Sequence, residues 1–276
     1  MRYTEAELKA MSYPINDKEK ENCLEILDLV KSLCLKLKYQ LVGEITGGQI
    51  AADYAYRLQL AGESLTLKII GGHAENTLGK QNVSVKVAVL ASCRDAAINL
   101  REALYMSLLA YGAEVSGTCF LNVNLSREVG NFRLMFGYGT TQEEVYFLRE
   151  NGNDNLRYLY KDSCELQRKN LATDYSFKKF LRIIKTIGPE LQQQSAVAKG
   201  ICYVKVTHIL SNLPDSEYIR FDNLEERLRY IVLRICFLLE KNHCLKECNG
   251  IKALFENEDE QKHYLAFFEA LRSWLA

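Results

Sequence analysis

The stretch from Leu65 to Cys93 constrains the fold of this chain most strongly. It starts with an apolar, strand-like segment that ends at Ile70 and is followed by the pair Gly71-Gly72. From residue 83 to 90 the residues alternate strictly, so the valines share one face of a strand, and the other face carries Ser84, Lys86, Ala88 and Leu90. Because glycine has no side chain, a Gly-Gly pair after a strand lets backbone N–H groups come close to an anion such as phosphate. The stretch therefore predicts two strands of one sheet with an anion-binding turn between them.

Hydrophobic periodicity along the rest of the chain predicts an α+β fold. The expected helices cover 16–41, 95–111, 176–187, 222–241 and 259–275, and the expected strands cover 50–60, 65–70, 83–91, 118–125, 131–137 and 144–149. Residues 200–214 fit either a helix or a strand. Residues 1–15 are expected to form a polar lead-in, and residues 151–175 a turn-rich crossover. Because all the expected strands end before residue 150, the order predicts an α/β lobe over 1–175 and a helical lobe over 176–276.

Composition limits the class of protein. The chain has 276 residues, and its Lys+Arg and Asp+Glu counts are both 35, which excludes a polycationic coat but not a local basic groove. No apolar run approaches ~18 residues and no signal peptide is visible, so we expect neither a membrane span nor export. The cysteines are scattered along the chain and their total is odd, which predicts free thiols in the cytoplasm or nucleus. Cys244 and Cys248, with His243 and His263, form only a weak zinc pattern, because the paired spacing of zinc knuckles is missing.

The layout around Gly71-Gly72 resembles the signature of the nucleotidyltransferase superfamily, which includes poly(A) polymerases, oligoadenylate synthetases and bacterial cyclic-oligonucleotide synthases. In that family a Gly-Ser or Gly-Gly turn precedes a strand with an Asp-x-Asp pair, and a third acid comes from a later strand. Here Gly71-Gly72 stands at the turn, with Gly47-Gly48 as the alternative. The three acid positions fall on Ser84, Lys86 and Arg133.

The C-terminal half carries softer patterns of the same kind. The segment SFKKFLRIIK resembles the family helix whose lysine reaches the nucleotide's phosphates, which places Lys185 in that role. The alternative is a solvated cationic stripe on an amphipathic helix, shared with Lys178 and Arg182. The resemblance spans roughly residues 16 to 275. It implies a nucleotidyltransferase-like mixed sheet packed against a C-terminal helical lobe.

The three acid positions decide what the resemblance implies for chemistry. Nucleotidyl transfer in the family needs two Mg²⁺ ions, and Mg²⁺ prefers carboxylate oxygens. Ser84 is a weak neutral ligand, whereas Lys86 and Arg133 are cations. The resemblance therefore implies no catalytic residues, no metal and no cofactor at these positions.

The same cations suit a different task. The resemblance implies a phosphate- or nucleotide-binding cleft built from Gly71, Gly72, Lys86, Arg133 and Lys185. The alternative is that these charges pair with Glu75, Asp95 or Glu114 and hold the fold together.

Three functions compete at this point. The favoured one is a catalytically inactive, nucleotidyltransferase-like protein that acts as a binding or assembly subunit, with a protein partner in a homo- or hetero-oligomer and RNA or a nucleotide as further ligands. The second is an active metal-dependent nucleotidyltransferase whose acids are displaced, with Asp95, Glu114, Glu128 and Glu143-Glu144 as candidates. The third is an unrelated α+β module that binds protein or nucleic acid.

Overall fold

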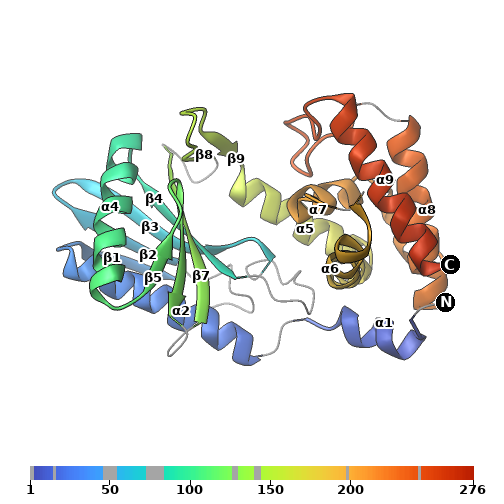
Figure 1. The fold of residues 1–276 in the computed structure, drawn as a ribbon, viewed down its shortest axis with the longest axis horizontal. Helices are drawn as coiled ribbons and strands as arrows, with labels where there is room; N and C mark the ends of the chain where they lie inside the picture. The colour runs from blue at the N-terminus through green and yellow to red at the C-terminus, as the bar shows by residue number, and fades with distance from the viewer. Residues whose placement is uncertain are drawn as a thin grey trace. The chain divides into compact units, whose positions relative to one another are not determined.

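The computed structural model describes residues 3–14, 17–45, 55–72, 84–125, 130–139, 144–196, 199–241 and 244–276. The chain divides into two compact units. A helical unit contains Met1–Pro14 and Lys161–Ala276, and a sheet unit contains Ile15–Asn76 and Val83–Tyr160. The sheet and the helices of each unit are drawn in Figure 1.

The described strands of the sheet unit form one mixed sheet. Its main path has the order β1-β2-β3-β4-β7-β6-β5, and β8 and β9 extend it beside β7. The bounds are β1 (Gln40–Ile45), β2 (Ala55–Leu60), β3 (Glu63–Ile70), β4 (Val85–Ala91), β5 (Glu114–Ser116), β6 (Phe120–Leu125), β7 (Gly130–Tyr138), β8 (Val145–Phe147) and β9 (Asn155–Arg157). β4 and β7 run parallel, and the other described pairs are antiparallel.

Two helices cover one face of this sheet, α2 (Asp17–Lys36) and α4 (Arg94–Ala110). Their apolar residues recur every three or four positions, so each helix turns one stripe toward the strands. That stripe packs on Val85, Val87 and Val89 of β4 and on the matching residues of the neighbouring strands. The alternation expected for this strand is confirmed, and it leaves Lys86 and its same-face neighbours on the opposite face.

The helical unit packs around α6 (Ser176–Gln194), which is buried over most of its circumference. The other elements are α1 (Glu5–Ser12), α5 (Leu159–Ala172), α7 (Tyr203–Ser211), the short 3₁₀ helix η3 (Asp215–Ile219), α8 (Leu224–Lys241) and α9 (Glu258–Leu275). The core of this unit is aromatic and aliphatic, with Phe177, Phe180, Phe267 and Phe268 fully buried.

Most expected elements are present, but several of their limits were wrong. The first long helix ends at Lys36 rather than at residue 41, because Lys38 adopts a left-handed conformation with φ 72° and the chain turns into β1. The expected lead-in contains α1, which begins with a capping box: Thr4 Oγ1 accepts from the Glu7 N–H, and the Glu7 carboxylate accepts from the Thr4 N–H.

Three corrections concern the C-terminal half. The expected crossover over 151–175 contains α5, and α6 continues through Gly188-Pro189 instead of ending before it. The start of α8 is capped by Asn223, whose Oδ1 accepts from the backbone N–H groups of Glu225 and Glu226, so this helix begins two residues later than the expected 222. The rival turn Gly47-Gly48 lies outside the described residues.

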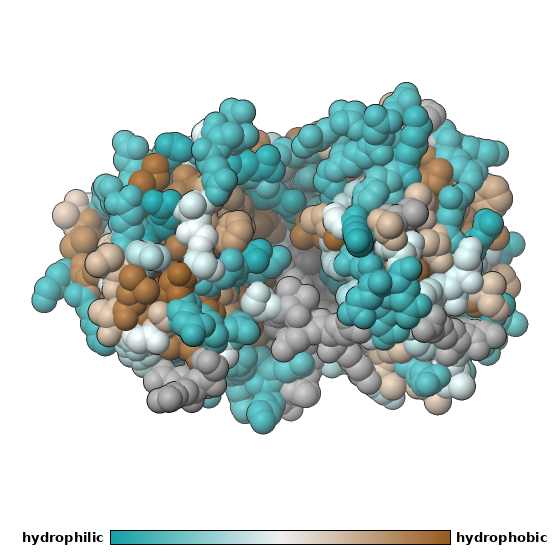
Figure 2. Space-filling model, in the orientation of Figure 1, coloured by the Kyte–Doolittle hydropathy of each residue, from teal (hydrophilic) through white to brown (hydrophobic). Residues whose placement is uncertain are grey.

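None of the helices within the described ranges is both long and apolar enough to span a bilayer. On the face shown in Figure 2, hydrophobic residues form separate patches among hydrophilic ones.

Candidate functional site

The register of the sheet brings two of the three expected acid positions side by side. Lys86 of β4 is the direct partner of Arg133 of β7 in the parallel pair. The same row continues to Ile70 of β3 and to Asn122 of β6. Because register partners project from the same face, Lys86, Arg133 and Asn122 all lie on the face that α2 and α4 leave uncovered. We call it the open face.

Arg133 is oriented by two neighbours on β6. Its Nε donates to Asn122 Oδ1 at 2.7 Å, and its guanidinium carbon lies 4.4 Å from the centre of the Phe120 ring. The hydrogen bond and the cation–π contact hold the planar group over the open face. The guanidinium keeps further N–H groups on its terminal nitrogens, a geometry that suits a phosphate.

The expected turn lies beside Lys86. Gly71 follows β3 with φ +74°, a conformation that favours glycine. A Cβ added to Gly71 would lie 3.7 Å from Cδ of Lys86, so the lysine side chain runs past the turn. Gly71 and Lys86 are therefore neighbours, as a shared phosphate site requires.

The first acid position opens into a polar cavity of about 420 Å³. Ser84 lines it together with Asn122, Asn124 and Asn131, and Glu114 of β5 contributes a carboxylate. Asn124 Nδ2 donates to Glu114 Oε2 at 2.9 Å. The three asparagines were not predicted as site residues from the sequence, although the alternation of residues 120–125 places Asn122 and Asn124 on one face.

A second cavity, of about 460 Å³, lies next to Arg133 and has a more apolar lining. Phe120, Met135 and Phe147 contribute ring and aliphatic surface, and Asn151 and Asn155 contribute amides. Phe120 joins the two features, because its ring lies under the Arg133 guanidinium and also lines this cavity.

Ser84, Lys86 and Arg133 do not suit a pair of divalent ions. A +1 charge about 4 Å from a +2 ion costs about 8 kcal/mol at an effective dielectric constant of about 20. Lys86 and Arg133 each bring such a charge, and Ser84 supplies at most a weak neutral oxygen. Binding of a divalent metal ion at these positions is therefore unfavourable.

Among the displaced-acid candidates, register favours Glu114. Asp95 follows the C-terminal end of β4, whereas Ser84 precedes its N-terminal end. Glu144 precedes β8, which pairs with the C-terminal end of β7. Glu114 instead pairs with Asn124, which pairs with Asn131 at the same sheet edge as Ser84. Glu75, Glu128 and Glu143 lie outside the described residues.

The cationic residues of α6 belong to the helical unit. Lys178 and Arg182 are buried, and they bond to Gln167 Oε1 at 3.1 Å and to the Ser12 carbonyl at 2.6 Å. The alternative of a solvated stripe is therefore wrong for these two residues. Lys185 is half-buried in this unit, and its phosphate-binding role stays a prediction.

Comparison with known proteins identifies the fold family. Residues 165–276 match the family model of the cGAS/DncV-like nucleotidyltransferase C-terminal helical domain. This match and the fold confirm the resemblance to the nucleotidyltransferase superfamily that was expected from the sequence.

Several relatives are similar over almost the whole chain. Cyclic GMP-AMP synthase CdnE03 of Staphylococcus schleiferi is 22% identical over 99% of this chain and 97% of that protein. The CdnE cyclic dinucleotide synthase of Elizabethkingia meningoseptica, solved with GTP and Apcpp, has a TM-score of 0.77 at 17% identity, covering 99% of both chains. The CdnE c-UMP-AMP synthase of Rhodothermus marinus has a TM-score of 0.63 at 14% identity, covering 99% of this chain and 97% of that one.

These comparisons correct the favoured function. The prediction of an inactive binding or assembly subunit is contradicted, because the relatives are synthases, and the alternative of an active nucleotidyltransferase is favoured. That prediction rested on the missing carboxylates at three positions. Cations can also neutralise phosphate charge, however, and a carboxylate can come from another strand. Protein partners, RNA binding and oligomeric state stay predictions.

Proposed function

We propose that this chain is an enzyme that acts on nucleoside triphosphates, a nucleotidyltransferase of the cyclic-dinucleotide-synthase type. The relatives supply the class of reaction. The pairing of Lys86 with Arg133 on the open face is the observation on which our version of the site rests. In this version of the site, Lys86 and Arg133 neutralise the phosphate charge that acid-bound metals neutralise elsewhere in the family.

The open face offers complementary surfaces for both ends of a nucleotide. The Lys86 ammonium, the Arg133 guanidinium and the Gly71 turn form an anion-binding group for the triphosphate. The apolar cavity beside Phe120 offers ring and aliphatic contacts for a base, and Asn151 and Asn155 offer amides that can bond to a base edge. Phe120 links the two, because its ring lies under the Arg133 guanidinium and also lines the apolar cavity.

The reaction can be assigned to residues of this chain. The oxygen of a ribose hydroxyl attacks the α-phosphorus of a triphosphate, and the bond from that phosphorus to the pyrophosphate oxygen breaks. The hydroxyl proton passes to the Glu114 carboxylate, which lines the cavity that Ser84 opens into. Lys86 and Arg133 stabilise the charge that builds up on the departing pyrophosphate.

The test measures turnover directly. The purified chain is incubated with ATP, GTP, CTP and UTP, singly and in pairs, with Mg²⁺, with Mn²⁺ and with EDTA. Pyrophosphate release is followed, and products are identified by anion exchange and mass spectrometry. We expect a cyclic or linear dinucleotide whose formation falls at least about tenfold in Lys86→Ala and in Glu114→Gln. Lys262→Ala, on the exposed surface of α9, serves as the control.

Failure has a clear signature. If no nucleotide mixture releases pyrophosphate under any of the three ionic conditions, the proposed activity is wrong. Product formation that is unaffected by Lys86→Ala and Glu114→Gln would keep the activity but place it at other residues.

The cysteines among the described residues are free thiols, which supports the predicted cytoplasmic or nuclear location.

A further inference from the structure

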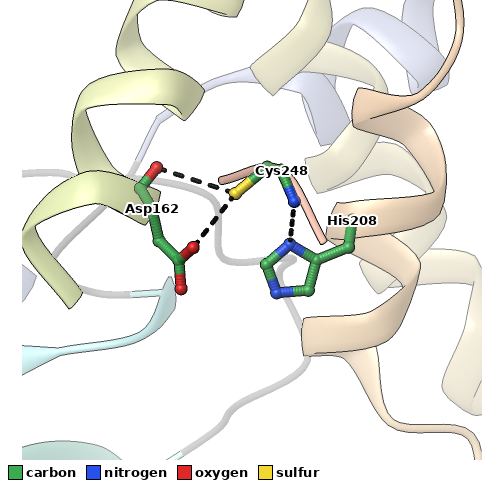
Figure 3. Close-up of side chains that lie close together, drawn as sticks. All are labelled: Asp162, His208 and Cys248. Carbon is green, nitrogen blue, oxygen red and sulfur yellow. Dashed lines mark hydrogen bonds between the residues drawn. The ribbon is translucent and has the colours of Figure 1, made fainter. Parts of the chain in front are cut away.

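Three chemically different side chains meet inside the helical unit (Figure 3). Asp162 comes from the first turn of α5, His208 from α7, and Cys248 from the segment between α8 and α9. Asp162 and His208 are 3% and 2% exposed. One potential ligand atom from each residue lies within 4.8 Å of those of the other two.

The three groups already contact one another. The Cys248 Sγ lies 3.4 Å from Asp162 Oδ1, and the Cys248 backbone N–H donates to His208 Nδ1 at 3.1 Å. In Figure 3 the thiol and the backbone N–H of Cys248 point to the carboxylate and the imidazole respectively. The nitrogen of His208 that faces Cys248 is therefore Nδ1.

A tight hairpin presents Cys248 to the other two residues. Lys246 and Ala253 form a β-bridge, and Leu254 N–H bonds to the Leu245 carbonyl at 2.8 Å. Gly250 closes the turn with φ +72°, and its N–H bonds to the Glu247 carbonyl at 2.8 Å. The cysteine therefore sits on a backbone turn held by its own hydrogen bonds.

A second set of bonds fastens this hairpin to the two helices. Asn249 is 5% exposed, and its Nδ2 donates to Asp162 Oδ1 at 2.6 Å. Asn212 Nδ2, just after α7, donates to the Lys246 carbonyl at 2.8 Å. Such outer contacts fix the orientation of ligating side chains in metal sites.

The donor set identifies the class of ion. A thiolate, an imidazole and a carboxylate are all zinc ligands, with bonds of about 2.0–2.3 Å. Tetrahedral geometry then requires ligand atoms about 3.3–3.8 Å apart. The Sγ–Oδ1 distance of 3.4 Å meets this requirement, and the 4.8 Å limit on the other pairs leaves about 1 Å of closure. A soft thiolate disfavours Mg²⁺ and Ca²⁺.

We propose that Asp162, His208 and Cys248 form a zinc site that ties α5, α7 and the α8–α9 hairpin together. Binding releases the thiol proton, and the metal takes the Nδ1 lone pair that now accepts the Cys248 N–H. The fourth position is open to water or to Glu247, whose Oε2 shares the Asn249 amide with Asp162 at 3.3 Å. This inference is independent of the proposed function.

The first experiment counts metal. The full chain, with no affinity tag, is loaded with Zn²⁺, passed through gel filtration and analysed by mass spectrometry for metals. We expect about one zinc per chain, because the three ligands come from a single cluster. We expect at least a tenfold loss of retained zinc in Cys248→Ala and in His208→Asn. The asparagine keeps an acceptor near the Nδ1 position but is a poor zinc ligand.

Controls and a second readout separate a built site from a surface ion. Cys244→Ala removes an exposed thiol four residues away and should keep the zinc. Loading with Co²⁺ should give a thiolate-to-metal charge-transfer band that disappears in Cys248→Ala. Wild-type chain that emerges from gel filtration without zinc would overturn the proposal and leave a purely hydrogen-bonded cluster. Retention that is equal in wild type, Cys248→Ala and His208→Asn would also overturn it, as an adventitious ion only.

Discussion

Lys86 and Arg133 are register partners across the parallel pair β4–β7, so two cations project side by side from the open face of the sheet. The fold family resemblance places both at positions where carboxylates would hold metal. Arg133 is further fixed by Asn122 and Phe120, so its charge cannot swing away at no cost. We propose that the sheet presents an anion site here, where its relatives are expected to present an acidic one.

Restoring the acids should convert the site to metal dependence. The triple variant Ser84→Asp, Lys86→Asp, Arg133→Asp is designed to place three carboxylates on the open face, two of them two residues apart at the start of β4. We expect it to bind Mn²⁺ in calorimetry and to bind ATP only when Mn²⁺ or Mg²⁺ is present. The neutral variant Ser84→Asn, Lys86→Met, Arg133→Met is the matched control. Equal Mn²⁺ binding by the two triple variants would show that these positions do not converge.

Tyr203 and Gly188 should be coupled in stability. The Tyr203 hydroxyl is buried and has no hydrogen-bond partner among the described residues. A Cβ at Gly188 would overlap it and lie 3.0 Å from two ring carbons. We expect Gly188→Ala to lower the free energy of unfolding by about 1–3 kcal/mol. Tyr203→Phe should be neutral or stabilising, because it removes an unsatisfied group.

The double variant provides the check. Urea unfolding of Gly188→Ala with and without Tyr203→Phe should show that the phenylalanine recovers part of the loss, since the overlapping oxygen is gone. Strictly additive effects of the two substitutions would contradict the contact.

Cys34 should make the stability depend on alkaline pH. Burial raises the pKa of its thiol to about 12, whereas a thiol in the unfolded chain has a pKa near 8.5. Between these values the folded chain keeps the proton and the unfolded chain releases it. The free energy of unfolding therefore falls as pH rises above about 8.5, by at most about 1.4 kcal/mol per pH unit for this group.

Urea titrations at pH 8 and pH 10, with a reducing agent, measure this dependence. Cys34→Ala should reduce it without abolishing it, because burial also raises the pKa values of the Cys23 and Cys236 thiols. Cys93→Ala, which removes an exposed thiol, should leave it unchanged. The same pH dependence in wild type and Cys34→Ala would show that the Cys34 thiol is not the group responsible.

The sheet could be predicted from sequence because its signals are local. Strict alternation over β4 identified both faces of the strand, and the order of elements identified the superfamily. Helix limits were harder, because Leu37 and Leu41 continue the helical spacing of α2, and only the left-handed conformation of Lys38 shows where the helix stops. The sequence does not reveal that a lysine will adopt this conformation.

The sites depend on contacts between distant segments. The pairing of Lys86 with Arg133 was expected from a family resemblance and not from the residues alone. The carboxylate of Glu114 reaches the same sheet edge only through the register of β5, β6 and β7. The proposed zinc ligands are spread over 87 positions, at Asp162, His208 and Cys248. The sequence had instead suggested a weak zinc pattern that joins Cys248 with Cys244. His263 packs against the Tyr264 ring and is not part of the cluster.

Nucleotide affinity in EDTA tests the central claim most directly, because it removes metal and leaves only the side chains to hold the phosphates. Calorimetry with ATP should show binding by wild type, and a loss of about 10- to 100-fold in affinity in both Lys86→Ala and Arg133→Ala, the range expected for a charge-assisted hydrogen bond. Lys262→Ala should bind as wild type does. Binding that requires Mg²⁺, or that is unchanged when Lys86 and Arg133 are both replaced by alanine, would contradict the account.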